Sequence, residues 1–100
     1  MDRNTILTML RRHRDELTDR GVASLSVVGS VARDEFTTDS DVDVVVTLAI
    51  PDKGFAYFRR LDELQQRLSE ILGRHVDLME EAAISPRVRR EIERDRVRAF

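Results

Sequence analysis

The hydrophobic pattern begins near the N-terminus with an apolar stripe at helical spacing. Within residues 4–20 this stripe comprises Ile6, Met9, Leu10, His13 and Leu17. Intervals of three and four residues place these side chains on one helix face, so we expect a single helix over residues 4–20. Gly21 follows as a natural helix stop. His13, a lone histidine at the edge of such a stripe, fits a core-edge residue better than a ligand.

Four short segments have the pattern of β-strands. Residues 24–28 alternate partly, and residues 42–48 form an almost continuous β-branched run, which is typical of a central strand buried on both faces. Residues 75–79 predict a third strand, and the alternation of residues 96–100 predicts a fourth at a sheet edge. Residues 31–40 are short and polar, so we expect one helical turn and a loop there.

Two further helices are predicted. The longer runs from Phe55 to Leu72, stops at Gly73, and places on one side Phe58, Leu61, Leu64, Leu68, Ile71 and Leu72. The shorter begins at Ser85-Pro86, a favourable N-cap and first helical position, and runs to about Arg94 with Val88 and Ile92 inward. We therefore expect an α/β fold, a small mixed β-sheet flanked by helices, as one domain over residues 1–100.

Composition narrows the function classes. The chain has 100 residues, 41% of them hydrophobic, which fits one small domain whose apolar surface a partner could complete. The lack of cysteine excludes disulfides and thiolate metal sites. No apolar run approaches the roughly 20 residues of a membrane span, and no secretory signal is apparent. We expect a cytoplasmic protein with no membrane association.

Charge is distributed unevenly along the chain. The formal net charge of −2 does not suggest a nucleic-acid or membrane surface. Residues 29–43 contain five acids against one base, whereas residues 85–100 contain six arginines against three acids. The arginine-rich segment is either a solvated helix face or a partner-binding face.

Asp41 and Asp43 stand at the entry of the predicted central strand. Side chains two residues apart on a strand point to the same face, so two carboxylates would be roughly 6–7 Å apart at their Cα atoms. That arrangement is unfavourable unless a cation neutralises it, and Mg²⁺ bound to carboxylates and substrate phosphates is the expected one. The alternative is an acidic turn with both carboxylates in water.

Gly29-Ser30 ends the preceding predicted strand. Glycine lets a backbone approach a phosphate closely, and the serine hydroxyl adds a donor; the alternative is a plain strand-to-helix turn. About ten residues separate this turn from the Asp pair, so the two strands can return as antiparallel neighbours. A phosphate cradle would then lie beside a metal-binding carboxylate pair, as a nucleoside triphosphate requires.

The combined pattern Gly29-Ser30-x-Ala32-Arg33-x-Glu35, followed by Ser40-Asp41-x-Asp43, resembles the signature of the DNA polymerase β-like nucleotidyltransferase superfamily. It looks most like the minimal nucleotidyltransferases found as antitoxins with HEPN-domain toxins. The element order and length extend the resemblance over nearly the whole chain. One departure is Asp34, where such proteins often have glycine after the Ala-Arg pair.

The resemblance implies a set of site residues. Asp41, Asp43 and a third acid on a later strand would be catalytic and bind two Mg²⁺ ions. Asp77 is the candidate for that third acid, because its neighbours Val76 and Leu78 point to the opposite face; Glu80 and Glu81 lie past the strand end. The implied nucleotide-binding residues are Gly29, Ser30, Arg33 and Ser40, although for Arg33 and Glu35 a structural role in the turn is the commoner expectation.

The resemblance also implies a reaction and a partner. It implies AMP transfer from Mg²⁺-ATP to a tyrosine of a HEPN-family toxin, in a type VII-like toxin–antitoxin pair, with ATP as substrate and no direct nucleic-acid partner. Two alternatives stay open: an antitoxin that neutralises its toxin by binding alone, and a nucleotidyltransferase acting on a small molecule. The three acids argue against the first, and the lack of room for a second domain argues against the second.

Overall fold

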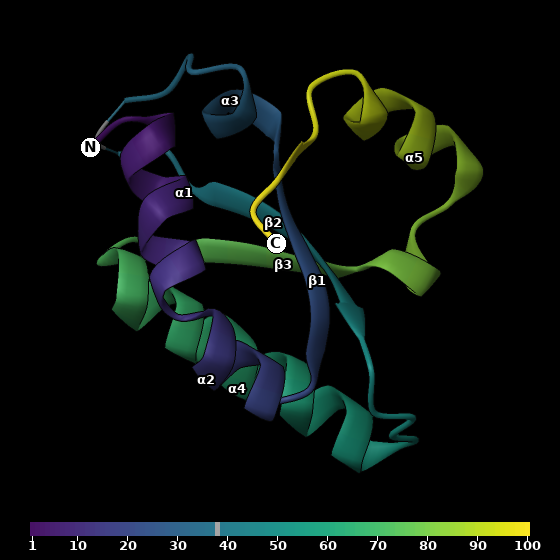
Figure 1. Ribbon diagram of the computed structural model, residues 1–100. Coiled ribbons are helices and arrows are strands. Elements are labelled where there is room, and N and C mark those ends of the chain that lie inside the picture. Colours follow the sequence, from purple (N-terminus) through teal and green to yellow (C-terminus); the bar gives the residue numbers. More distant parts are fainter. Residues whose placement is uncertain (38) are drawn as a thin grey trace.

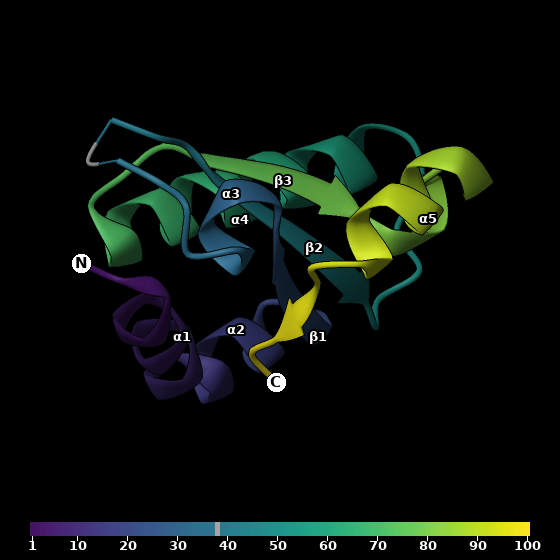
Figure 2. The ribbon, with the colours of Figure 1, turned by 90° about the horizontal axis from the view of Figure 1, so that it is seen from above.

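A four-stranded mixed sheet forms the centre of the computed structural model, which describes residues 1–37 and 39–100. Its strands lie in the order β3-β2-β1-β4. β1 (Val22–Val28) is antiparallel to β2 (Val42–Leu48) and to the edge strand β4 (Val97–Arg98), and β2 is parallel to β3 (Val76–Glu80). The predicted small mixed sheet, the antiparallel β1–β2 pair and the C-terminal edge strand are confirmed (Figures 1 and 2).

Helices lie on both sides of this sheet. α1 (Arg3–Arg12), α2 (Arg14–Asp19) and the long α4 (Phe55–Leu72) cover one face, whereas α5 (Pro86–Glu93) lies on the other side (Figure 1). Two short turns, α3 (Gly29–Ala32) and the 3₁₀ turn η1 (Glu81–Ala83), follow the ends of β1 and β3. Among the helices described, none has both the length and the apolar character needed to cross a membrane.

The core lies between the sheet and the α1, α2 and α4 helices. Strand alternation sends Val42, Val44 and Val46 of β2 into this layer, where Ile6, Leu10, Leu17, Leu64 and Leu68 meet them. Alternate β2 residues, Asp43 and Val45, therefore project from the opposite face. The apolar layer fixes the face on which polar side chains can gather.

The N-terminal helical segment is broken, and the prediction of one helix over residues 4–20 is wrong. α1 ends at Arg12 and α2 begins at Arg14. The Nδ1 atom of His13 lies 2.8 Å from the Met9 carbonyl oxygen, the acceptor that the His13 N–H would use in a continuous helix. That N–H turns instead to the Leu10 carbonyl at 3.1 Å.

The bounds of α4 match the prediction, but its inward face is shorter than predicted. Leu64, Leu68, Ile71 and Leu72 are buried, whereas Phe58 is 67% exposed. On α5 the Ser85 Oγ caps the Val88 N–H at 3.3 Å, as expected. The predicted inward position of Val88 is wrong, because this residue is 37% exposed.

The arginine-rich segment is partly used inside the protein. The Glu81 carboxylate accepts hydrogen bonds from Arg96 at 2.9 and 3.0 Å and from Arg89 at 2.6 Å. Arg96 Nε also donates to the Ser26 hydroxyl at 3.1 Å, which joins the C-terminal segment to β1. These arginines stabilise the fold, so the exposed cationic surface is smaller than the sequence suggests.

Candidate functional site

Asp41, Asp43 and Asp77 gather where β2 and β3 begin, on the sheet face turned away from the core. The parallel register places Asp43 directly beside Asp77. Asp41 precedes Asp43 by two positions and so shares its face. The sequence argument predicted one face for Asp41 and Asp43, and the structure adds Asp77 to the same side.

Asp43 is the most enclosed of the three acids. Burial raises the pKa of its carboxyl above the ordinary value of 3.8, and the negative charges of Asp77 and Asp41, with a hydrogen bond to Asp77, raise it further. A raised carboxyl pKa means that the ionised form lacks compensating positive charge. The cluster is therefore electrostatically suited to a bound cation.

Gly29 brings the β1–α3 turn against the Asp43 carboxylate. Its backbone has φ of +71°, and a Cβ placed on it would lie 2.7 Å from Asp43 Oδ2. A real side chain there would displace the carboxylate, so glycine is required both by conformation and by space. Ser30, the next residue, is half-buried in α3, and its carbonyl accepts from the Glu35 N–H at 2.9 Å.

His75 is a polar member of this cluster that sequence analysis missed. It lies one residue before β3, and its Nε2 is 3.0 Å from Asp77 Oδ1. Ligand atoms of Asp41, His75 and Asp77 all lie within 4.8 Å of one another. The available signal was its position two residues before Asp77, which puts both side chains on the same strand face.

Two other predicted nucleotide-binding residues have partners elsewhere in the chain. Ser40 Oγ accepts from the Thr37 N–H at 3.0 Å, which closes the loop before β2. Arg33 pairs with Glu35 and Asp95, both at 3.3 Å, and these contacts tie the turn after α3 to the end of α5. Asp34 has φ of +60°, a left-handed conformation that glycine adopts without strain and aspartate tolerates.

Two glutamates at the end of β3 are committed to structural contacts. The prediction that Glu80 lies past the strand end is wrong, because β3 extends to Glu80 and pairs there with Val46 of β2. Glu80 accepts from the Tyr57 hydroxyl at 3.5 Å and caps the Ala82 N–H at 2.5 Å. Glu81 is held by Arg96, and this hydrogen bond is the main reason that its pKa is lowered. Both glutamates are therefore engaged within the protein.

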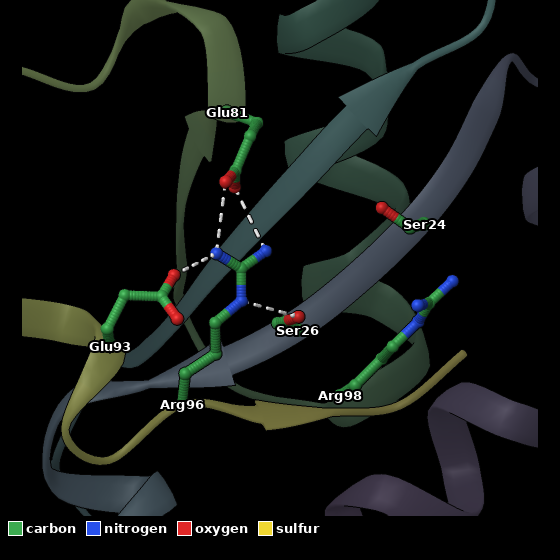
Figure 3. A pocket seen from close by; sticks show the side chains of 6 residues that line it. All are labelled: Ser24, Ser26, Glu81, Glu93, Arg96 and Arg98. Carbon is green, nitrogen blue, oxygen red and sulfur yellow. Dashed lines mark hydrogen bonds and ion pairs between the residues drawn. The ribbon is translucent and has the colours of Figure 1, made fainter. Parts of the chain in front are cut away.

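A polar pocket of about 420 Å³ lies farther along the sheet face that carries Asp43. Ser26 belongs to this face because its neighbour Val28, two residues on, pairs with Asp43. Figure 3 shows Arg96 at the centre of the pocket, between Glu81, Glu93 and Ser26. The remaining lining residues are Ser24 and Arg98.

The donor set fits a hard divalent cation. Carboxylate oxygens of Asp41, Asp43 and Asp77 are ligands that Mg²⁺ accepts together with phosphate oxygens. The close approach of the Gly29 backbone leaves no side chain between Asp43 and an incoming phosphate. The open sheet face therefore offers three carboxylates to a divalent cation.

Comparison with known proteins agrees with this geometry. The sequence profile of the nucleotidyltransferase domain matches residues 10–99. The chain belongs to the nucleotidyltransferase domain family. The predicted fold and the predicted enzyme class, nucleotidyltransferase, are thereby confirmed.

Relatives of this nucleotidyltransferase include archaeal proteins of similar length. It is 33% identical over 92 residues to protein adenylyltransferase MntA of Thermococcus cleftensis. This alignment covers 90% of this chain and 88% of that protein. It is 37% identical over 92 residues to a candidate protein adenylyltransferase of Methanocaldococcus jannaschii, covering 90% of both chains.

Solved structures of similar fold agree with this assignment. A candidate minimal nucleotidyltransferase superposes with a TM-score of 0.77 at 31% identity, over 97% of this chain and 95% of the other. A second structure contains a tri-AMPylated HEPN toxin of Shewanella oneidensis in complex with its MNT antitoxin. One chain of that complex superposes with a TM-score of 0.65, over 94% of this chain and 71% of that chain. The two sequences are only 18% identical, so this similarity concerns the fold.

Proposed function

We propose that this nucleotidyltransferase transfers AMP from Mg²⁺-ATP to a tyrosine hydroxyl of a HEPN-family toxin and thereby acts as its antitoxin. The observation that carries the proposal is the convergence of Asp41, Asp43 and Asp77 on one open sheet face beside Gly29. The name of the Thermococcus relative and the composition of the Shewanella complex support the acceptor class.

The acids have separable roles. Asp41 and Asp43 hold the metal that accompanies the triphosphate, and the Gly29-Ser30 turn receives the phosphates. Asp77, the third acid, would help to hold the catalytic metal that acts on the attacking hydroxyl. Magnesium, when bound, neutralises phosphate charge and lowers the pKa of that hydroxyl.

The bond changes are those of a nucleotidyl transfer. The acceptor oxygen forms a bond to the α-phosphorus, the bond to the bridging oxygen breaks, and pyrophosphate leaves. The hydroxyl proton passes to water. Because no covalent intermediate with the protein is needed, the chain contributes through positioning and electrostatics.

Exposed apolar surface supports a protein partner. Phe55 is 91% exposed and Phe58 is 67% exposed at the start of α4, and together they form what we call the aromatic patch. Burying these two rings in an interface would remove apolar surface from water and so favour a complex. A small domain that leaves these residues in water is suited to act with a second protein.

The test is a transfer assay with a HEPN-family toxin from the same organism. The purified pair is incubated with ATP and Mg²⁺, and intact mass spectrometry measures the toxin. We expect a mass increase of one or more AMP units, and none with Asp41→Asn or Asp43→Asn. A variant that neutralises the toxin without any mass change would instead support the binding-only antitoxin.

A further inference from the structure

His75 occupies a position in the acidic cluster that the proposed reaction does not use. The parallel β2–β3 pairing continues one residue before Val42 and Val76, where the Val42 N–H donates to the His75 carbonyl at 3.0 Å. Asp41 and His75 therefore lie side by side on neighbouring strands, two residues before the pair Asp43 and Asp77. The imidazole side chain lies on the acidic face and is exposed.

The spacing of the ligand atoms is close to that of one coordination sphere. In an octahedral site with metal–ligand bonds of about 2.1 Å, adjacent ligand atoms lie about 3.0 Å apart and opposite ones about 4.2 Å. His75 Nε2 and Asp77 Oδ1 are separated by 3.0 Å, and Asp41 completes a set within 4.8 Å. Small side-chain rotations would bring the ligand atoms of Asp41, His75 and Asp77 within bonding distance of one ion.

We infer that His75 is a metal ligand and that, with Asp41 and Asp77, it makes a nitrogen–oxygen site selective for a divalent first-row transition ion over Mg²⁺. An imidazole nitrogen is a poor ligand for Mg²⁺ and a good one for transition ions, whereas carboxylates serve both. The inference deepens the proposed function, because it assigns the ion held on the Asp77 side of that same site.

The chain offers a matched control for this inference. Its sequence contains two histidines, and the other, His13, lies between α1 and α2 with its Nδ1 on the Met9 carbonyl. His75→Gln removes the imidazole but keeps a polar side chain at an exposed position, so the fold should persist. His13→Gln removes an imidazole away from the cluster.

The experiment measures Mn²⁺ binding to the nucleotide-free chain. Electron spin echo envelope modulation of bound Mn²⁺ detects a coordinated ¹⁴N nucleus directly, and titration calorimetry gives the affinities for Mn²⁺ and Mg²⁺. We expect ¹⁴N modulation in the unmodified protein and in His13→Gln, and its loss in His75→Gln. The Mn²⁺ affinity of His75→Gln should fall roughly tenfold or more, with the Mg²⁺ affinity nearly unchanged.

Two outcomes would overturn the inference: bound Mn²⁺ without ¹⁴N modulation in the unmodified protein, or unchanged Mn²⁺ affinity in His75→Gln. Neither depends on catalysis. A protein that shows the nitrogen signal but transfers no AMP would count against the proposed function alone. A protein that transfers AMP without the nitrogen signal would count against the His75 ligand alone.

Discussion

Gly29 and the Asp43 carboxylate are packed so closely that a Cβ on Gly29 would come within 2.7 Å of Asp43 Oδ2. Gly73 provides a contrast, because it has a similar φ of +65° but nothing within 4 Å of its Cβ position. A substitution at Gly73 therefore measures the backbone strain alone. The same substitution at Gly29 adds the cost of displacing Asp43.

Alanine substitution at these glycines should therefore have unequal effects. Gly73→Ala should lower the free energy of unfolding by about 1–2 kcal/mol, the cost of a left-handed backbone with a side chain. Gly29→Ala should cost more and should also weaken Mg²⁺-ATP binding, because the carboxylate must move. Urea denaturation and calorimetry measure these effects, and equal losses of stability in the two variants would contradict the close contact.

The three acids should separate in binding and transfer assays. Asp41→Asn or Asp43→Asn should weaken Mg²⁺-ATP binding and abolish transfer. Asp77→Asn should bind the nucleotide nearly normally, while transfer falls on the order of 10²-fold or more because Asp77 serves the attacking hydroxyl and not the triphosphate. Asp62→Asn, at an exposed position on α4, is the control. Full transfer by Asp77→Asn would remove Asp77 from the catalytic set.

Glu81 should make stability depend on pH below neutrality. The Arg96 hydrogen bonds hold its pKa below the ordinary value of 4.5, so the folded protein binds this proton less tightly than the unfolded chain does. Its contribution is therefore full above pH 4.5 and is lost as the pH falls through the lowered pKa. Glu81→Gln should lose about 1–3 kcal/mol at pH 7, and the difference from the unmodified protein should shrink in acid.

Thermal or urea unfolding at several pH values measures this dependence. Glu91→Gln is a suitable control, because Glu91 is exposed and lies 3.8 Å from Arg87. It should change stability little at any pH. A constant difference between Glu81→Gln and the unmodified protein from pH 7 down to pH 3 would show that the charge of Glu81 does not matter.

The aromatic patch should contribute to partner binding and little to folding. Phe55→Ser with Phe58→Ser should leave the melting temperature nearly unchanged, because both rings are mostly in water. The affinity for the HEPN partner should fall at least tenfold if the patch lies in the interface. Biolayer interferometry with the purified partner gives this value, and unaltered affinity would exclude the patch from the interface.

The arginines of the C-terminal segment should fall into two groups. Reversal of exposed Arg87 and Arg90 to glutamate should reduce co-purification with the partner while the fold persists. Reversal of Arg96 should unfold the protein, because it would oppose Glu81 and Glu93. Circular dichroism separates loss of the fold from loss of partner binding. Undiminished co-purification of the Arg87/Arg90 variant would show that these arginines lie outside the interface with the partner.

Elements with strong local signals could be predicted from the sequence. The β-branched run of β2 and the capped amphipathic pattern of α4 gave the observed bounds, since each pattern is uniform up to its end. The break at His13 could not be predicted, because it depends on a side-chain contact with the Met9 carbonyl and not on the apolar stripe. The exposure of Phe58 depends on the packing around the start of α4, which periodicity does not encode.

The candidate site shows the same division. The shared face of Asp41 and Asp43 follows from strand geometry. Asp77 followed from the family resemblance, which implies a third acid on a later strand, together with the alternation of that strand. The addition of His75 required the β2–β3 register, which places it beside Asp41. The use of Arg89 and Arg96 inside the fold required the position of Glu81, since a count of charges cannot show which of them are paired.

The late position of β4 has a consequence for how the chain folds. Its segment is joined to the rest by hydrogen bonds between residues far apart in sequence, Arg96 to Ser26 across 70 positions and Arg11 to Ala99 across 88. Contacts of such long range close large loops and slow the folding of small domains. On the ribosome, β1 would gain its second neighbour only after residues 97–98 had emerged, so the β1–β2–β3 portion forms first and pairing with β4 completes the sheet.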